Sequence, residues 1–150
     1  MIIFAPQEFI TWVNMLVQFP WPIQVDDFVP YAERLGWTPT PRPTWFNVNA
    51  NNDTRNVILG DDRSGNVRDL FLSMARNEAE DDEGAVELND HFVSCVAAGR
   101  KAWGEPFLLE AGDGPSVTWR FPGDMFAQVI SGRWSVLFDF FTPEGRRQFL

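Results

Sequence analysis

The stretch VTWRFPGDMFAQVISGRWSVLFDF, residues 117–140, decides the fold class, because it reads as three strands joined by two short turns. Apolar residues stand at every second position from Val117 to Phe121, which is the period of a strand with one buried face. Turn residues occupy 122–124 and 131–132. The third strand has its apolar side chains on one face, at Trp134, Val136, Phe138 and Phe140. Short turns between strands predict antiparallel hairpins.

Upstream of this stretch, three further segments read as strands. Residues 67–76 form the longest, and Leu70, Leu72 and Met74 share one of its faces. Residues 45–50 and 55–59 are shorter strands around a polar turn at 51–53. The composition of residues 60–65, which include two glycines and two aspartates, predicts a loop.

Helical spacing of apolar residues predicts two helices near the start of the chain and one in the middle. The first opens at Pro6 and stops before the prolines at 20 and 22. The second is capped by Asp26 or Asp27 and ended by Gly36. The third ends at Gly104. Its predicted apolar stripe consists of Phe92, Cys95, Val96, Gly99 and Trp103. We expect a short C-terminal helix after a Thr142 cap.

The predicted order is therefore α-α-β-β-β-α-β-β-β, with the short helix at the end. Helices that are segregated from hairpins indicate an α+β fold. We expect residues 1–150 to form a single α+β domain, with a curved antiparallel sheet of about five to six strands and helices packed on one face.

Composition limits the classes of function. The chain has 150 residues, 45% hydrophobic content and a formal net charge of −9. This charge disfavours binding to nucleic acid or to an anionic membrane and favours a basic protein partner, although acidity also serves solubility alone. The first residues lack the basic region of a signal peptide, and no apolar run approaches the length of a membrane span. A cytoplasmic location is expected.

An acidic block without a single basic residue lies between residues 78 and 90. Its acids are Glu78, Glu80, Asp81, Asp82, Glu83, Glu87 and Asp90. Their spacing does not match an EF-hand, so a solvated acidic connection, with no metal site, is the expectation. Some of these acids also favour the N-terminus of the following helix.

Few residues offer catalytic chemistry. His91 stands four positions before the single cysteine, Cys95, but the surrounding acids would raise the pKa of a thiol there. We expect Cys95 in the core and His91 on the surface. The pair Asp61 and Asp62 suits a turn. No catalytic residue and no cofactor is predicted, and a hydrolase that uses acids alone is the least favoured hypothesis.

Four short motifs occur in a familiar order along the chain. They are the segment from Asp27 to Gly36-Trp37, Asn89-Asp90-His91-Phe92, Trp103-Gly104-Glu105-Pro106 and Val117-Thr118-Trp119-Arg120. Over residues 25–140 this pattern resembles a family of small actinobacterial proteins of unassigned function, which are similar to immunity proteins of polymorphic-toxin and type VII secretion loci. The resemblance implies a protein that binds a secreted toxin and blocks its active site.

The leading hypothesis is a non-enzymatic immunity protein that inhibits a cognate toxin with a basic cleft, such as one acting on nucleic acid or NAD. The residues expected to contact that partner are Glu78, Glu80, Asp81, Asp82 and Glu83, with Asp61 and Asp62 next. The alternative is a secretion chaperone or adaptor for an exported protein. The sequence leaves the oligomeric state open.

Overall fold

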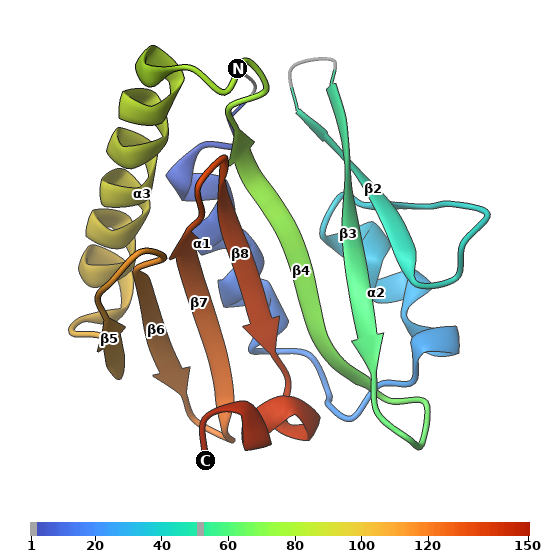
Figure 1. Cartoon of the computed structure of the whole chain (residues 1–150). Helices are drawn as coiled ribbons and strands as arrows, with labels where there is room; N and C mark the ends of the chain where they lie inside the picture. The colour runs from blue at the N-terminus through green and yellow to red at the C-terminus, as the bar shows by residue number, and fades with distance from the viewer. Residues whose placement is uncertain (1–2, 51–52) are drawn as a thin grey trace.

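The computed structural model describes residues 3–50 and 53–150, and over these residues it contains one antiparallel sheet of eight strands (Figure 1). The strands lie side by side in the order β1-β2-β3-β4-β8-β7-β6-β5. Their bounds are β1 (Thr38–Pro39), β2 (Trp45–Ala50), β3 (Asp53–Asp61), β4 (Val67–Arg76), β5 (Leu108–Glu110), β6 (Ser116–Phe121), β7 (Met125–Ser131) and β8 (Ser135–Phe141). The sheet thus joins an N-terminal meander, β1 to β4, to a C-terminal meander, β5 to β8, through the β4–β8 pair.

Three α-helices cover one face of this sheet. They are α1 (Pro6–Leu16), α2 (Val29–Arg34) and α3 (Asp82–Trp103), and the 3-10 helices are η1 (Val25–Asp27) and η2 (Pro143–Gln148). The helices reach the sheet through the contacts Phe9–Phe138 for α1, Phe28–Phe46 for α2 and Gly99–Trp119 for α3. Helix η2 follows β8 directly and lies near the end of the sheet where β3 and β4 are connected (Figure 1).

Alternation along β8 separates the two faces of the sheet. Val136, Phe138 and Phe140 are fully buried beneath the helices. Leu137 and Asp139 lie on the other face, because successive side chains of a strand point to opposite sides. Burial of each large apolar side chain on the helix-covered face contributes roughly 1.5–3 kcal/mol.

The α+β class and the antiparallel arrangement are confirmed, but the predicted number of strands is too low. The six predicted strands correspond to β2, β3, β4, β6, β7 and β8. The two that were missed, β1 and β5, lie at the edges of the sheet and have two and three residues. So short a segment cannot show an alternating pattern, and both edge strands are mostly exposed.

Three local predictions need correction. Asp26 and Asp27 lie within η1 and make no cap, since α2 begins after Phe28. The C-terminal helix is a 3-10 helix; Thr142 occupies its N-cap position as predicted, but the hydroxyl makes no cap bond and donates to the carbonyl oxygen of Val67 at 2.7 Å. The predicted loop at 60–65 begins later, because β3 continues through Asp61. The turn predicted at 51–53 includes residues 51–52, which lie outside the described residues.

A glycine sets the distance between α3 and the sheet. A Cβ atom at Gly99 would lie 2.5 Å from two ring carbons of Trp119. Trp119 cannot move aside easily, because only 1% of it is exposed and its indole N–H donates to the carbonyl oxygen of Gly104 at 3.0 Å. Close approach of helix and strand at this point therefore requires glycine.

We predict that Gly99→Ala lowers the free energy of unfolding by about 2 kcal/mol, because the overpacking of Trp119 outweighs the gain in helix propensity. Denaturant unfolding measures this loss. Ser94→Ala, at an exposed position of the same helix, is the matched control and should change stability by less than about 0.5 kcal/mol. Equal stability of the two variants would contradict the tight packing of α3.

Candidate functional sites at the two ends of the sheet

One end of the sheet carries the acidic block, and its first role is to start α3. Asp81 is the N-cap residue, and its carboxylate accepts the backbone N–H of Gly84 at 2.8 Å. The side-chain amide of Asn77, a residue that is only 2% exposed, donates to the carbonyl oxygen of Asp81 at 2.9 Å. Because the backbone N–H of Asn77 also donates to Trp134, the helix start is fixed to the end of β4. Asp81 therefore has a structural role.

The remaining acids of this end form an exposed surface, which we call the acidic surface. It consists of Glu78, Glu80, Asp82, Glu83 and Glu87. None of these carboxylates forms an ion pair with another described residue. Val86 and Val93 of α3 are 63% and 59% exposed. An unpaired acidic surface beside exposed valines is suited to contact a protein with a basic surface.

The opposite end of the sheet contains a hollow of about 1010 Å³, which we call the cleft. The turn between β3 and β4, residues 62–66, bounds it on one side together with Asp61 at the end of β3, and η2 bounds it on another. Its floor is the face of the sheet that the helices leave open. Helix η2 is held in place because Thr142 binds β4 and because Gly145 packs directly on the Arg68 backbone.

Two carboxyl groups, Asp69 of β4 and Asp139 of β8, belong to the lining of the cleft. In the sheet register Asp69 pairs with Phe141 and Asp139 with Phe71, so the two acids are diagonal neighbours on one face. Burial raises the pKa of Asp139 to about 7, and the nearby charge of Asp69 adds to this effect. Burial also raises the pKa of Asp69, although Arg68 at 3.4 Å opposes the shift. A carboxyl group with such a pKa exchanges its proton near neutral pH.

The turn beside the cleft depends on Asp62. Its carboxylate accepts hydrogen bonds from the backbone N–H groups of Asn66 and Ser64 at 2.9 and 2.8 Å. Both bonds lower the pKa of Asp62, and the bond from Asn66 has the larger effect. Asp62 therefore shapes the turn, whereas Asp61 is exposed at the end of β3. Four arginines also line the cleft: Arg63, Arg68, Arg146 and Arg147.

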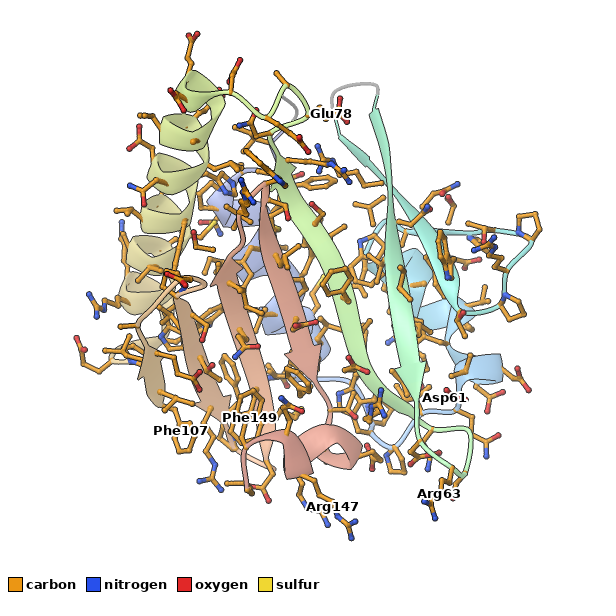
Figure 2. All side chains as sticks on the ribbon, viewed as in Figure 1. Asp61, Arg63, Glu78, Phe107, Arg147 and Phe149 are labelled. Atoms are coloured by element: carbon orange, nitrogen blue, oxygen red, sulfur yellow. The ribbon has the colours of Figure 1, made fainter. Side chains whose placement is uncertain are left out.

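The residues predicted to form one contact surface thus lie in two separate places. Figure 2 shows Glu78 at one end of the sheet and Asp61, Arg63 and Arg147 at the other. The sequence analysis missed Asp69, Asp139 and the arginines of the cleft. The sequence did contain a signal for Asp139. It is the single acid between Phe138 and Phe140, so the alternation of the strand places it on the face opposite the two phenylalanines.

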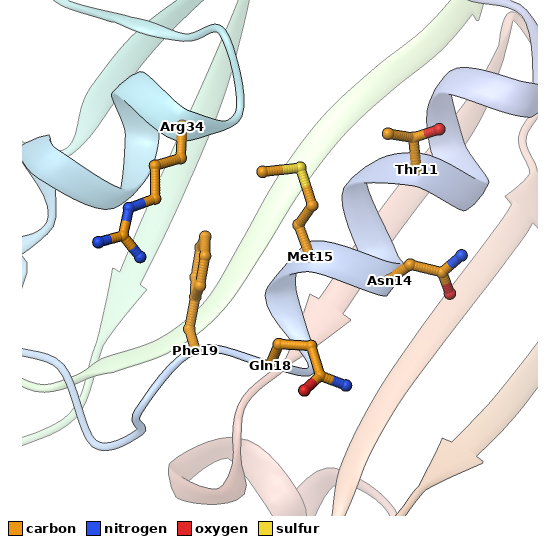
Figure 3. Close-up of a pocket in the computed structure, with 6 residues that line it drawn as sticks. All are labelled: Thr11, Asn14, Met15, Gln18, Phe19 and Arg34. Carbon is orange, nitrogen blue, oxygen red and sulfur yellow. The ribbon is translucent and has the colours of Figure 1, made fainter.

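A second hollow, of about 440 Å³, lies between α1 and α2 (Figure 3). Met15 and Phe19 line it from the side of α1, and Arg34 lines it from α2. It contains no carboxylate, histidine or cysteine, so we assign no chemistry to it. Among the described residues, no group of three or more histidine, cysteine or acidic side chains is arranged to hold a metal ion.

Comparison with known families places most of the chain in one of them. Residues 7–142 match the model of a family of unknown function, DUF6301. The chain belongs to this family. The match includes residues 25–140, on which the resemblance noted above was based, but it carries no link to actinobacteria or to immunity proteins. Neither the curated proteins nor the solved structures provided a match to this DUF6301 chain.

The one histidine of this DUF6301 chain is buried, which corrects the prediction of a surface position. His91 is 6% exposed, and its Nε2–H donates to the carbonyl oxygen of Phe4 at 2.8 Å. The prediction of Cys95 in the core is confirmed, with 0% exposure. Burial raises the pKa of the Cys95 thiol to about 12 and lowers the pKa of His91. The thiol is therefore protonated at neutral pH and unsuited to nucleophilic attack. None of the helices within residues 3–50 and 53–150 has the length and apolar character of a membrane span.

We predict that Asp81→Ala lowers the free energy of unfolding by about 1 kcal/mol, because α3 loses its N-cap hydrogen bond. Asp82→Asn removes a neighbouring charge but no cap, and should cost less than about 0.5 kcal/mol. Thermal or denaturant unfolding of both variants provides the comparison. Equal losses would show that charge at the helix start, and not the cap, is what Asp81 supplies.

We predict that Asp139 makes stability fall as the pH rises. The unfolded carboxyl group loses its proton near pH 4, whereas the folded one keeps it to about pH 7, so the unfolding free energy decreases between these values and levels off above them. Between pH 5 and pH 8, Asp139→Asn should remove about 2–3 kcal/mol of this decrease. Denaturant unfolding at both pH values measures it. Asp113→Asn, in an exposed loop, is the control and should keep the wild-type slope.

Proposed function

We propose that this chain is a non-enzymatic immunity protein, which binds a secreted toxin in the cytoplasm of the cell that produces it and blocks its basic cleft. The observation that carries the proposal is the acidic surface, whose exposed carboxylates have no ion-pair partner among the described residues. Asp82 and Glu83 also favour the N-terminus of α3, but Glu78, Glu80 and Glu87 lie outside its first turn, and an exposed acidic surface of this kind attracts a basic partner. The proposed producer is an actinobacterium, as the sequence resemblance implies.

The exposed valines of α3 support a protein partner in particular. Val86 and Val93 are seven residues apart on one helix and so lie on nearly the same side of it. Apolar side chains that become buried at the centre of an interface slow dissociation, whereas charges at its rim mainly raise the association rate. The combination of Val86 and Val93 with Glu83 and Glu87 provides both elements on one helix.

A second candidate function is that of a secretion chaperone or adaptor. The observation that favours it is the edge strand β5, in which Leu109 is 59% exposed and before which Phe107 is 45% exposed. An extended segment of an exported protein can add to such an edge through backbone hydrogen bonds. In that case Leu109→Asp should abolish binding, and the acidic surface should be dispensable.

The immunity proposal predicts that this chain protects cells from a toxin encoded next to its gene. Co-expression with that toxin domain should restore growth, and failure to restore growth in spite of soluble expression would contradict the proposal. In purified form, the triple variant Glu80→Gln, Asp82→Asn and Glu83→Gln should associate with the toxin domain about tenfold more slowly at low salt.

The control is a second triple variant with the same change in net charge, Glu33→Gln, Glu110→Gln and Asp113→Asn, whose residues are exposed and lie outside the acidic surface. Surface plasmon resonance at low and high salt measures both association rates. Equal association rates for the two triple variants at low salt would exclude a specific role of the acidic surface, and Asp81 is left unchanged so that α3 keeps its cap.

A further inference from the structure

The cleft at the other end of the sheet is not used by the proposed contact with a toxin, and its composition is unusual for an ordinary surface hollow. Five carboxyl groups and four guanidinium groups line it, which gives a formal balance of −1. The apolar side chains of Ile130 and Phe141 belong to the same lining. Pockets of this size that combine apolar walls with a few polar groups are typical of small-molecule sites.

Asp139 is the group of the cleft that most clearly lacks a partner. Its carboxyl group forms no hydrogen bond or ion pair with another residue of the described ranges 3–50 and 53–150. Burying a carboxylate without a partner is unfavourable, and Asp69 increases this cost. The neighbouring amide of Gln128 donates one of its two N–H groups to the hydroxyl of Thr118 at 3.1 Å and forms no hydrogen bond with Asp139.

A second acid in the cleft is similarly unsatisfied. The Oε2 atom of Glu144 is buried and has no hydrogen-bond partner among the described residues. Buried polar atoms almost always have a partner, so the Oε2 atom of Glu144 indicates a missing donor. Asp139, which is half-buried in the same cleft, has a carboxyl group that such a donor could also reach. Such a donor would be a guanidinium, an ammonium or a group of N–H donors.

Positively charged arginine side chains also line the cleft. Arg63 in the turn and Arg147 on η2 form no ion pair with another described residue, and Arg146 donates to the carbonyl oxygen of Pro143 at 2.9 Å. Guanidinium groups bind carboxylates and phosphates strongly. The charged residues that line the cleft with Asp139 are Asp61, Asp62 and Arg63 of the turn, Arg68 and Asp69 of β4, and Glu144, Arg146 and Arg147 of η2.

We propose that the cleft binds a small zwitterionic ligand of the arginine type, whose cationic end pairs with Asp139 and Glu144 and whose carboxylate meets Arg147 and Arg63. A net charge of +1 on arginine complements the balance of −1 in the cleft. Polyanions such as nucleoside triphosphates are disfavoured by five carboxyl groups. Free arginine and a C-terminal arginine residue of a peptide share the required chemistry, and the experiment distinguishes these two sources.

Isothermal titration of the full chain with L-arginine tests the proposal, with two analogues as probes. Citrulline replaces the guanidinium by a neutral urea group and should bind at least about tenfold more weakly. Agmatine lacks the carboxylate and should also bind more weakly. Equal binding of arginine and citrulline, or no saturable binding of arginine at millimolar concentration, would overturn the proposal.

The peptide Gly-Gly-Arg, with a free C-terminus, separates the two sources. Tighter binding of this peptide than of arginine would assign the cleft to a chain terminus, whereas exclusion of the peptide would assign it to the free amino acid. Either result supports the shared chemistry, provided that the amidated peptide binds less well than the free one. Equal binding of the amidated and free peptides would contradict a role for Arg147 and Arg63.

Substitutions of single cleft residues test which side chains bind arginine. Asp139→Asn should abolish arginine binding while the folded state is retained, since the substitution removes an unfavourable buried charge. Arg147→Ala should weaken binding of arginine but leave that of agmatine unchanged. Asp113→Asn is the matched control, because it removes an exposed acid far from the cleft lining. Unchanged arginine binding in Asp139→Asn would overturn the assignment.

Proton release supplies an independent test. If the cation binds ionised Asp139, binding at pH 6 should release close to one proton, which appears as a dependence of the observed enthalpy on the buffer. The release should approach zero at pH 8.5, where Asp139 is already ionised in the free protein. Failure to detect release at pH 6 would contradict a direct pairing with Asp139. The triple variant of the acidic surface should bind arginine normally, so this proposal and the immunity proposal fail independently.

Discussion

The alternation of Phe138, Asp139 and Phe140 along β8 is the constraint on which the rest of the structure depends. The two phenylalanines must face the helices, because α1 and the neighbouring strands bury them completely. A strand has a period of two, so the residue between them must face the other side. Since β8 lies between β4 and β7, that side is the middle of the open face and not an edge. The hydrophobic core therefore fixes a carboxyl group at a half-buried position on the open face.

The separation of the two candidate sites follows from the same sheet. Strand β4 extends from the cleft, at Val67 to Asp69, to the acidic end, at Arg76. Its length keeps the acidic surface and the arginines apart, although the residues that form them are mixed along the sequence. The net charge of −9 is thus unevenly distributed, with one strongly acidic end and one nearly balanced end.

Sequence reasoning predicted the elements that have a long regular pattern and missed those that depend on tertiary contacts. The strands at 45–50 and 67–76 and the helix ending at Gly104 could be predicted because their apolar periodicity extends over several residues. The burial of His91 could not, because it depends on a carbonyl group of Phe4, which is 87 residues away in sequence. The cleft was missed for a similar reason, since the turn after β3 and the elements β4, β7, β8 and η2 all contribute to it. Asp62 was correctly placed at a turn, whereas Asp61 ends β3, and nothing local showed that Asp139 contributes to the same cleft.

The burial of the single cysteine has a practical consequence for biophysical work. Cys95 is fully buried on the inner side of α3, and its thiol is protonated at neutral pH. Maleimide reagents react with accessible thiolates, so the natural chain should remain unlabelled. A cysteine introduced at an exposed position can then be modified selectively without removing Cys95. A fluorophore at either end of the sheet would thus report on that end alone, in an otherwise unaltered protein.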